Sequence, residues 1–260
     1  MKKIGIIYKR EDEIIANTAK KLASEFAPDF KVILEEKKIA DVEFIITLGG
    51  DGTILRASKF GFPLLSVHLG GLGIMSEINL DAITEAVSKI KAKKFIVDER
   101  MMLEVGIAGK KSKTIKKELA LNDVVIGKNE IARTIKLDAF LGDRLMANYV
   151  GDGLIISTPS GSTAYNFAVM GPILPPNSKS FVISPICPHR AANRSVVLTD
   201  PVLVKLVKGD EILLTIDGQT KISLHPGDFV SVKPSKLTTK FIRFQEYDLW
   251  NLLRVKMGWG

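Results

Sequence analysis

The fold of this protein is decided by Phe44-Ile45-Ile46-Thr47-Leu48-Gly49-Gly50-Asp51-Gly52-Thr53. The run from Phe44 to Leu48 is typical of a buried strand, and a helical segment, Thr53–Phe60, follows the glycines. Glycines let a backbone approach a phosphate closely, and a helix N-terminus favours negative charge beside it. In a parallel sheet, ligands also bind beyond the carboxyl ends of the strands. The stretch therefore predicts a nucleotide-phosphate site, unless it is a tight strand-to-helix turn in which Asp51 caps the helix.

The residues around this stretch alternate between strand-like and helix-like patterns, which is the signature of an α/β domain. We predict strands at Lys3–Tyr8, Phe30–Leu34, Phe44–Leu48 and Leu64–His68. We predict helices from Ile14 to Phe26, over Thr53–Phe60 and over Leu80–Lys91. Helical connections of this kind join parallel strands. Residues 1–95 are therefore predicted to form a Rossmann-like α/β domain, and the apolar run near Met1 is interpreted as its first strand rather than as a signal peptide.

From Phe95 onward the pattern changes to many short β-branched runs separated by Gly, Asp and Lys. The strands predicted here include Met101–Ile107, Leu121–Ile126, Thr134–Phe140, Leu154–Ile156, Val202–Leu206, Glu211–Ile216 and Phe229–Val232. This spacing is typical of an all-β, sandwich-like domain, which we place at residues 96–239. Ser162–Met170 is predicted to be a short helix within it. The tail, residues 240–260, is predicted to be helical over Glu246–Met257 and to pack back on the first domain.

The composition excludes several classes of protein. The 260 residues are 46% hydrophobic and 25% charged, as in ordinary globular proteins, and no apolar run is long enough to span a membrane. The single cysteine cannot form an internal disulfide. Because the three histidines are far apart in the sequence, we predict no metal site from the cysteine and the histidines. The net charge of +8 comes from scattered lysines without a nucleic-acid-binding motif. We therefore expect a cytoplasmic protein that binds neither nucleic acid nor membranes, and whose positive charge suits small phosphorylated substrates.

A second distinctive stretch lies in the β-rich part of the sequence. It reads Gly151-Asp152-Gly153-Leu154-Ile155-Ile156-Ser157-Thr158-Pro159-Ser160-Gly161-Ser162-Thr163-Ala164-Tyr165-Asn166. Ser160, Ser162 and Thr163 offer hydroxyl groups that can bond to the edge of an adenine or an amide, although the same groups also suit a helix cap. Tyr165 either offers a flat face to an aromatic ring or packs in the core. The density of polar residues beside an apolar strand favours binding.

Both stretches resemble those of known kinases. The glycine-rich loop is similar to the loop of NAD kinases, of diacylglycerol and sphingoid lipid kinases and, more distantly, of phosphofructokinases. Gly151–Asn166 resembles the long signature of the NAD kinase family in particular. Shorter segments agree with that family in order and separation: Leu121-Asn122-Asp123, Ser184–His189 with Arg194-Ser195, and Asp217-Gly218-Gln219. The resemblance covers nearly the whole chain, including its Trp-Gly ending and the change from α/β to β organisation.

The resemblance implies a role for each residue that matches a family motif. Asp51 would be the base beside the 2′-hydroxyl of the adenosine ribose of NAD. Gly49, Gly50, Gly52 and Thr53 would hold the donor phosphates. The dinucleotide would be contacted by Asn122, Asp123, Asp152, Ser160, Thr163, Ala164, Tyr165, Asn166, Phe167, Ala168 and Gln219. In known members the carboxylate that matches Asp152 acts partly across a subunit interface. Arg56 and Arg133 are weaker matches that also suit a solvated surface.

The resemblance also implies a reaction. It implies an NAD kinase that forms NADP from NAD with ATP or polyphosphate, with Mg²⁺ or another divalent cation on the donor, and that is a homodimer or homotetramer. A lipid kinase of the same superfamily and a non-catalytic dinucleotide-binding regulator are the alternatives. The sequence departs from the family at Val150, where a polar or basic residue is frequent. In the loop His68–Met75, Gly71 and Ile74 replace a basic and an aromatic residue, which leaves the choice between NAD and NADH open.

Overall fold

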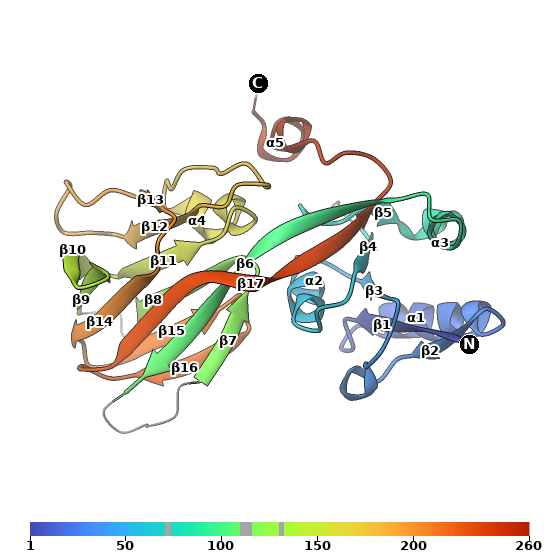
Figure 1. Ribbon diagram of the computed structural model, residues 1–260, viewed down its shortest axis with the longest axis horizontal. Helices are drawn as coiled ribbons and strands as arrows, with labels where there is room; N and C mark the ends of the chain where they lie inside the picture. Colours follow the sequence, from blue (N-terminus) through green and yellow to red (C-terminus); the bar gives the residue numbers. More distant parts are fainter. Residues whose placement is uncertain (71–73, 110–115, 130–132, 260) are drawn as a thin grey trace. The chain divides into compact units, whose positions relative to one another are not determined.

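The computed structural model describes residues 1–70, 74–109, 116–129 and 133–259. The chain forms two compact units (Figure 1), one of Met1–Glu99 with Thr239–Gly260 and one of Arg100–Thr238. Two long strands, β6 (Ile96–Ala108) and β17 (Phe229–Arg243), contribute residues to both units. The α/β part followed by a β-rich part confirms the predicted fold class. In the described residues, no helix has both the length and the apolar character needed to cross a membrane.

The N-terminal unit is built on a parallel sheet. Its strands are β1 (Lys2–Tyr8), β2 (Phe30–Ile33), β3 (Phe44–Leu48) and β4 (Leu64–His68), in the order β2-β1-β3-β4. The neighbouring strands are parallel, with Ile6 opposite Ile46 and Ile45 opposite Leu64. The short strand β5 (Ile78–Asn79) pairs with β4, and so does the end of β17, at Phe241. The carboxyl ends of the predicted strands therefore lie on one edge of the sheet.

Helices pack on the faces of this sheet. They are α1 (Glu13–Phe26), α2 (Asp51–Ser58) and α3 (Ile83–Lys91). The unit also contains α5 (Leu249–Met257) and the 3-10 turns η1 (Glu36–Lys38) and η2 (Leu80–Ala82). The apolar sides of α1 and α3 share one buried cluster with alternate residues of β1, β3 and β4, such as Ile6, Ile46 and Leu65. The helix expected at Thr53–Phe60 begins at Asp51, because Gly50 occupies the cap position. The helix expected from Glu246 begins at Leu249, after the cap at Asp248.

The C-terminal unit is a sandwich of two sheets. One holds β10 (Arg144–Gly151), β9 (Ile135–Leu141), β14 (Val202–Lys208) and β17 in that order, with β6 beside β17 and β7 (Lys116–Ala120) beside β6. The other has the order β13 (Val196–Leu198), β12 (Phe181–Ile186), β11 (Gly153–Ser157), β8 (Asp123–Lys128), β15 (Ile212–Ile216) and β16 (Thr220–Leu224). One buried cluster takes residues from both sheets, among them Leu137, Val204, Ile126 and Ile156. That shared core is what a sandwich requires.

Two local details differ from the expectations. Strand β8 begins at Asp123 rather than at Leu121, because the N–H groups of Leu121 and Asn122 bind a side-chain carboxylate. The helix expected over Ser162–Met170 is a 3-10 turn, η3 (Gly161–Thr163), followed by the short helix α4 (Tyr165–Ala168). The two are separated at Ala164, whose φ and ψ of −101° and −126° are not helical.

Gly153, at the start of β11, is a site where only glycine fits. A Cβ there would lie 2.5 Å from the carbonyl oxygen of Ile126 on β8. Its partner across the strands, Gly127, is less crowded, since a Cβ there would be 3.8 Å from its nearest neighbour. We predict that Gly153→Ala lowers the free energy of unfolding by about 1–3 kcal/mol, because β8 and β11 must move apart, and that Gly127→Ala changes it by less than about 1 kcal/mol. Urea denaturation measures both, and equal losses would contradict the prediction.

Candidate active site

The glycine-rich loop joins β3 to α2 in the N-terminal unit. Gly49 has a φ of +140°, and a Cβ there would lie 2.8 Å from Thr53 Oγ1, so the turn requires glycine. Gly50 is the N-cap of α2, and its exposed backbone and that of Gly52 flank Asp51. A Cβ at Gly50 or Gly52 would meet no atom within 4 Å, so a ligand can approach the backbone closely. Together with the start of an α-helix, this geometry suits a phosphate group.

The side chain of Asp51 is held by the loop that follows β4. Its two oxygens accept hydrogen bonds from the N–H groups of Ile74 and Met75, each at 3.3 Å. The residue is half-buried at the first position of α2. These bonds fix the orientation of the carboxylate without using all of its acceptor positions. Asp51 can therefore still accept a proton or a hydrogen bond from a ligand.

The two arginines that matched the family weakly are both engaged within the protein. Arg56 donates through Nη2 to the carbonyl oxygen of Tyr8 at 2.7 Å, and its Nε lies 3.1 Å from Glu36 Oε1. These contacts tie α2 to the end of β1. In the C-terminal unit, Arg133 is largely exposed and pairs with Asp210 at 2.5 Å. The alternative interpretation of Arg133, a solvated surface arginine, agrees with this environment.

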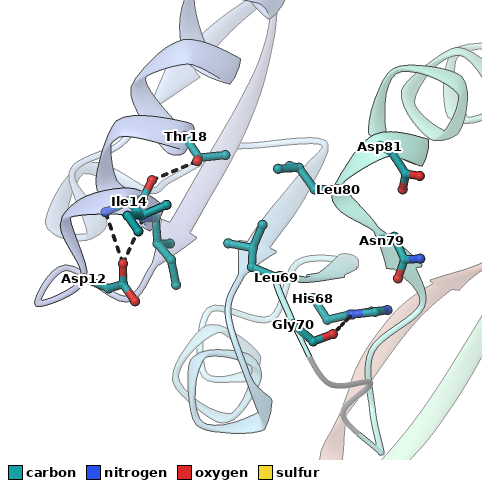
Figure 2. Close-up of a pocket in the computed structure, with 10 residues that line it drawn as sticks. Asp12, Ile14, Thr18, His68, Leu69, Gly70, Asn79, Leu80 and Asp81 are labelled. Atoms are coloured by element: carbon teal, nitrogen blue, oxygen red, sulfur yellow. Dashed lines mark hydrogen bonds between the residues drawn. The ribbon is translucent and has the colours of Figure 1, made fainter.

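A cleft of about 960 Å³ opens at the carboxyl edge of the N-terminal sheet (Figure 2). It is lined by Asp12, Ile14, Ile15, Thr18, His68, Leu69, Gly70, Asn79, Leu80 and Asp81. Figure 2 shows the first turn of α1, where Asp12 accepts from the N–H of Ile14 at 3.1 Å, facing the segment that follows β4. Among these described lining residues there is neither a lysine nor an arginine, and two are aspartates. The cleft is therefore poorly suited to a polyphosphate, and the glycine-rich loop remains the better phosphate site.

In the C-terminal unit, Asp217 holds the Asn122-Asp123 motif in place. Its carboxylate accepts hydrogen bonds from the N–H groups of Leu121 at 2.9 Å, Asn122 at 2.7 Å and Asp123 at 3.2 Å. Asp217 has a φ of +52° in the turn between β15 and β16, and the exposed Gln219 ends that turn. Sequence reasoning selected Gln219 and missed Asp217. An Asp-Gly pair is typical of a turn, but it does not indicate the long-range bonds.

The segment after β11 packs directly on this motif. Thr158 donates from Oγ1 to the carbonyl oxygen of Leu121 at 2.5 Å and from its N–H to that of Asn122 at 2.9 Å. A Cβ at Gly161 would lie 2.1 Å from the carbonyl oxygen of Asn122, so glycine is required. Asn122 itself is 9% exposed, and its buried Oδ1 has no hydrogen-bond partner in the described part of the chain. An unsatisfied buried acceptor is costly, so it indicates a place where a ligand donates.

Residues 158–168, the hydroxyl-rich segment, comprise side chains that bond within the segment and side chains that face outward. Thr163 donates to the carbonyl oxygen of Ser160 at 3.2 Å, and Ser162 donates to that of Pro159 at 2.7 Å. The fully buried amide of Asn166 donates to Ser162 and Pro172 and accepts from Ser184. The side chains of Thr163 and Asn166, expected to contact a ligand, thus have internal partners. The outward or half-buried members are Ser160, Ala164, Tyr165, Phe167 and Ala168, of which Tyr165 is 45% exposed.

Asp152 lies away from this group of residues. Its Oδ1 is 2.7 Å from Nζ of Lys128 at the end of β8. Asp152 precedes β11 and Thr158 follows it, which places them about 20 Å apart at the rise of an extended strand. Asn122 lies beside Thr158. Within one chain, Asp152 therefore lies next to the first residue of β11, while Asn122 lies beside the residue that follows its last one.

Two family models match the chain. They are the ATP-NAD kinase N-terminal domain, over residues 4–95, and the ATP-NAD kinase C-terminal domain, over residues 121–244. The chain belongs to the ATP-NAD kinase family. Among its relatives, the NAD kinase of Sulfurimonas denitrificans is 33% identical over 280 aligned positions, which cover 100% of this chain and 98% of the relative. The NAD kinase of Geobacter sp. (strain M21) is 38% identical over 229 positions, 85% of this chain and 79% of the relative.

Solved structures of NAD and NADH kinases share the fold. A yeast NADH kinase complexed with NADH aligns with a TM-score of 0.89 at 23% identity, over 100% of this chain and 88% of that one. An NAD kinase from Archaeoglobus fulgidus in complex with ATP aligns with a TM-score of 0.76 at 20% identity, over 98% and 97%. At these identities the likeness concerns the fold alone.

Membership of the ATP-NAD kinase family confirms the resemblance carried by Gly151–Asn166. The lipid kinase and the non-catalytic regulator are not supported. The departure from the family at Gly71 falls, with Leu72 and Gly73, outside the described residues. Ile74 is described, and its N–H binds Asp51. Ile74, which departs from the family, is thus one of the two residues whose N–H groups orient the Asp51 carboxylate.

The pKa of Asp123 is raised to about 7, first by burial and then by the negative charge of Asp217. A carboxyl group whose pKa is higher in the folded protein than in the unfolded chain binds its proton more tightly when folded. Its contribution to stability is therefore fully present below the unfolded pKa of about 4, and it is lost as the pH rises through about 7. Near neutral pH this NAD kinase family member thus carries Asp123 in both protonation states.

We predict that the free energy of unfolding of the wild type falls relative to that of Asp123→Asn between about pH 5 and about pH 8. The uncharged asparagine does not carry the cost of burying a charge beside Asp217. The difference changes by at most about 1.4 kcal/mol per pH unit. Urea denaturation of both proteins at the two pH values measures it. A difference that is the same at both values would contradict the raised pKa.

Proposed function

We propose that this protein transfers the terminal phosphoryl group of ATP to the 2′-hydroxyl group of the adenosine ribose of NAD, which yields NADP and ADP. The observation that carries the proposal is the match to both ATP-NAD kinase domains, over residues 4–95 and 121–244. The alignment with the Sulfurimonas denitrificans NAD kinase covers 98% of that protein, so both of its halves have a counterpart here.

The C-terminal unit supplies the contacts with NAD in this proposal. The buried Oδ1 of Asn122 needs a donor, which a ribose hydroxyl or an amino group of the nucleotide provides. Asp123 follows Asn122, and its N–H also donates to the carboxylate of Asp217. The exposed ring of Tyr165 is available to stack on an aromatic base. Ser160, Ala164, Phe167, Ala168 and Gln219 contribute the surrounding surface.

The N-terminal unit supplies the phosphoryl donor site and the base. The backbone of Gly49, Gly50, Gly52 and Thr53 surrounds the donor phosphates at the start of α2. Asp51 orients the 2′-hydroxyl and accepts its proton as the oxygen bonds to the γ-phosphorus, while the bond from that phosphorus to the β–γ bridging oxygen breaks and ADP leaves. Such transition states are loose, so the geometry of the carboxylate matters more than its basicity.

A divalent cation fits this proposal as part of the donor. Within the described residues, no group of three or more His, Cys, Asp or Glu side chains is arranged to hold a metal ion. Mg²⁺ commonly keeps its waters and binds through substrate phosphates with one or two carboxylates. The phosphates of ATP would hold the cation, which would neutralise their charge, and Asp51, between Gly50 and Gly52, would be the candidate carboxylate.

The experiment that tests the reaction is a steady-state assay that offers NAD and NADH with Mg-ATP or polyphosphate. NADP and NADPH are measured separately, and diacylglycerol is offered in parallel as an acceptor. NADP formed with ATP supports the proposal, while phosphorylated lipid alone, or no product with any donor, contradicts it. A cytoplasmic location is part of the proposal, and the single cysteine agrees with a reducing compartment.

We predict that Asp51→Asn lowers kcat by about 10²- to 10⁴-fold while the affinity for NAD changes little. Asparagine keeps the shape of the side chain but cannot take up the hydroxyl proton. Turnover assays with a separate titration of NAD binding measure the two effects. Glu85→Gln, on the exposed side of α3, is the control for loss of a carboxylate in the same unit. Near-normal turnover of Asp51→Asn would remove Asp51 from the role of base.

We propose further that the active enzyme contains at least two copies of the chain. Asp152 and Asn122 lie at opposite ends of β11, so the side chain of Asp152 is about 20 Å along the strand from the residues around Thr158. The resemblance to the family implies, in addition, that the carboxylate matched by Asp152 acts partly across a subunit interface. A homodimer or homotetramer in which Asp152 of one copy serves the site of another accounts for both observations.

We predict that a mixture of Asp51→Asn and Asp152→Asn chains is more active than either variant alone. In a mixed dimer, one site combines an intact Asp51 with an intact Asp152 from the other copy. After unfolding and refolding together at equal amounts, the mixture should recover up to about a quarter of wild-type activity. Activity assays before and after mixing measure the gain. A mixture that is no more active than its components would show that Asp152 serves its own chain.

A further inference from the structure

The last residue of β17, Arg243, is a buried cation in the N-terminal unit. It is 2% exposed, and its guanidinium group pairs with Glu77 at 2.9 Å and with Asp98 at 3.2 Å. It also lies over the rings of Phe241 and Tyr247, at 4.9 and 5.2 Å from the ring centres. A charge taken out of water needs such partners. The position of Arg243 is therefore defined from several sides.

The same guanidinium group reaches the loop that orients Asp51. Nη1 of Arg243 donates to the carbonyl oxygen of Met75 at 3.3 Å, and Ser66 Oγ donates to the same oxygen at 3.0 Å. The N–H of Met75 in turn donates to Asp51 Oδ1 at 3.3 Å. Glu77, two residues after Met75, is held by its bonds to Arg243 and to the N–H of Phe244 at 2.8 Å. Met75 thus lies between Arg243 and Asp51. Its carbonyl oxygen is held by Arg243 and Ser66, and its N–H donates to the Asp51 carboxylate.

We infer that Arg243 is a positioning residue for the reaction, acting on Asp51 through Met75. The inference rests on the proposed role of Asp51 as base. With the carbonyl oxygen of Met75 held by Arg243 and Ser66, its N–H keeps the Asp51 carboxylate turned toward one direction. In a reaction controlled by geometry, a displacement of about 1 Å costs on the order of 10²-fold in rate.

An arginine suits this role for a physical reason. Its planar fork presents several N–H donors in a fixed arrangement, so it bonds to Glu77, Asp98 and Met75 at the same time. A lysine at this position keeps the positive charge but has a single nitrogen on a flexible stem, so it cannot reproduce the contacts. Arg243→Lys therefore separates the charge from the geometry.

The alternative is that Arg243 only stabilises the fold. Loss of one partner of a buried ion pair destabilises a protein whatever the function of its neighbours. If the role of Arg243 is purely structural, its replacement lowers the amount of folded enzyme. The loss of activity is then the same whether or not Asp51 can take a proton. A positioning role has no further effect once the carboxylate is replaced by an amide. The two explanations therefore differ in a double-mutant cycle.

The experiment compares Arg243→Lys in the wild-type background and in the Asp51→Asn background, at saturating NAD and ATP and well below the unfolding temperature. We expect kcat of Arg243→Lys to fall on the order of 10- to 100-fold with the KM for NAD within about twofold, and no further fall in the Asp51→Asn background. An equal loss in both backgrounds, or no loss in the wild-type background, overturns the inference. Near-normal turnover of Asp51→Asn alone removes the base role itself, which is a different result.

Two further variants complete the experiment. Ile242→Val, a conservative change at the adjacent buried residue of β17, is the matched control and should leave kcat unchanged. Ser66→Ala removes the other donor to the Met75 carbonyl oxygen and replaces the first variant if Arg243→Lys does not fold. It should show the same pattern with a smaller loss of kcat. A loss of kcat that persists in the Asp51→Asn background overturns the inference for this variant as well.

Discussion

The carboxylate of Asp217 is buried, so it has to be hydrogen-bonded, and the N–H groups that satisfy it belong to Leu121, Asn122 and Asp123. This requirement shapes the end of the C-terminal unit where we propose that the nucleotide binds. It stops β8 from starting before Asp123. It also places a second carboxylate beside the first, which together with burial raises the pKa of Asp123. One buried charge thus sets the local backbone and the position of Asn122, and it adds to the effect of burial on the pKa of Asp123.

The N-terminal unit uses the same physical device with the opposite charge. Arg243 is buried, so it must be surrounded by acceptors, and the carbonyl oxygen of Met75 is one of them. In both units backbone groups connect the buried charge to a residue of the proposed site, through Met75 in one unit and through the N–H groups of Asn122 and Asp123 in the other. Backbone groups are suited to this because they are held at both neighbours and have no rotamers of their own. The carboxylates and amides of the proposed site are therefore oriented by residues that do not themselves need to touch a substrate.

The sequence predicted the parts of this structure that depend on local pattern. Buried runs such as Phe44–Leu48 and Leu64–His68 have the strand bounds that were expected, because an apolar run between turn residues defines a buried strand by itself. Strand β10, Arg144–Gly151, was not predicted, since its half-buried pattern is irregular and contains few β-branched residues. The roles of Asp217 and Arg243 were out of reach for another reason. Their partners are up to 96 and 168 positions away, and no local pattern encodes such contacts.

The hydroxyl-rich segment shows why a signature can identify a family more firmly than it identifies contacts. Much of its polarity serves the segment itself, because a turn that leaves β11 beside the fully buried amide of Asn166 must satisfy many backbone groups internally. The architecture of the segment thus accounts for many of the same polar residues that binding would. Matching Gly151–Asn166 therefore indicates the fold of the site, while the unsatisfied oxygen of Asn122 indicates where a ligand is needed. For the residues around this segment, a buried polar atom without a partner is therefore better evidence of a binding contact than a polar side chain whose bonds are internal.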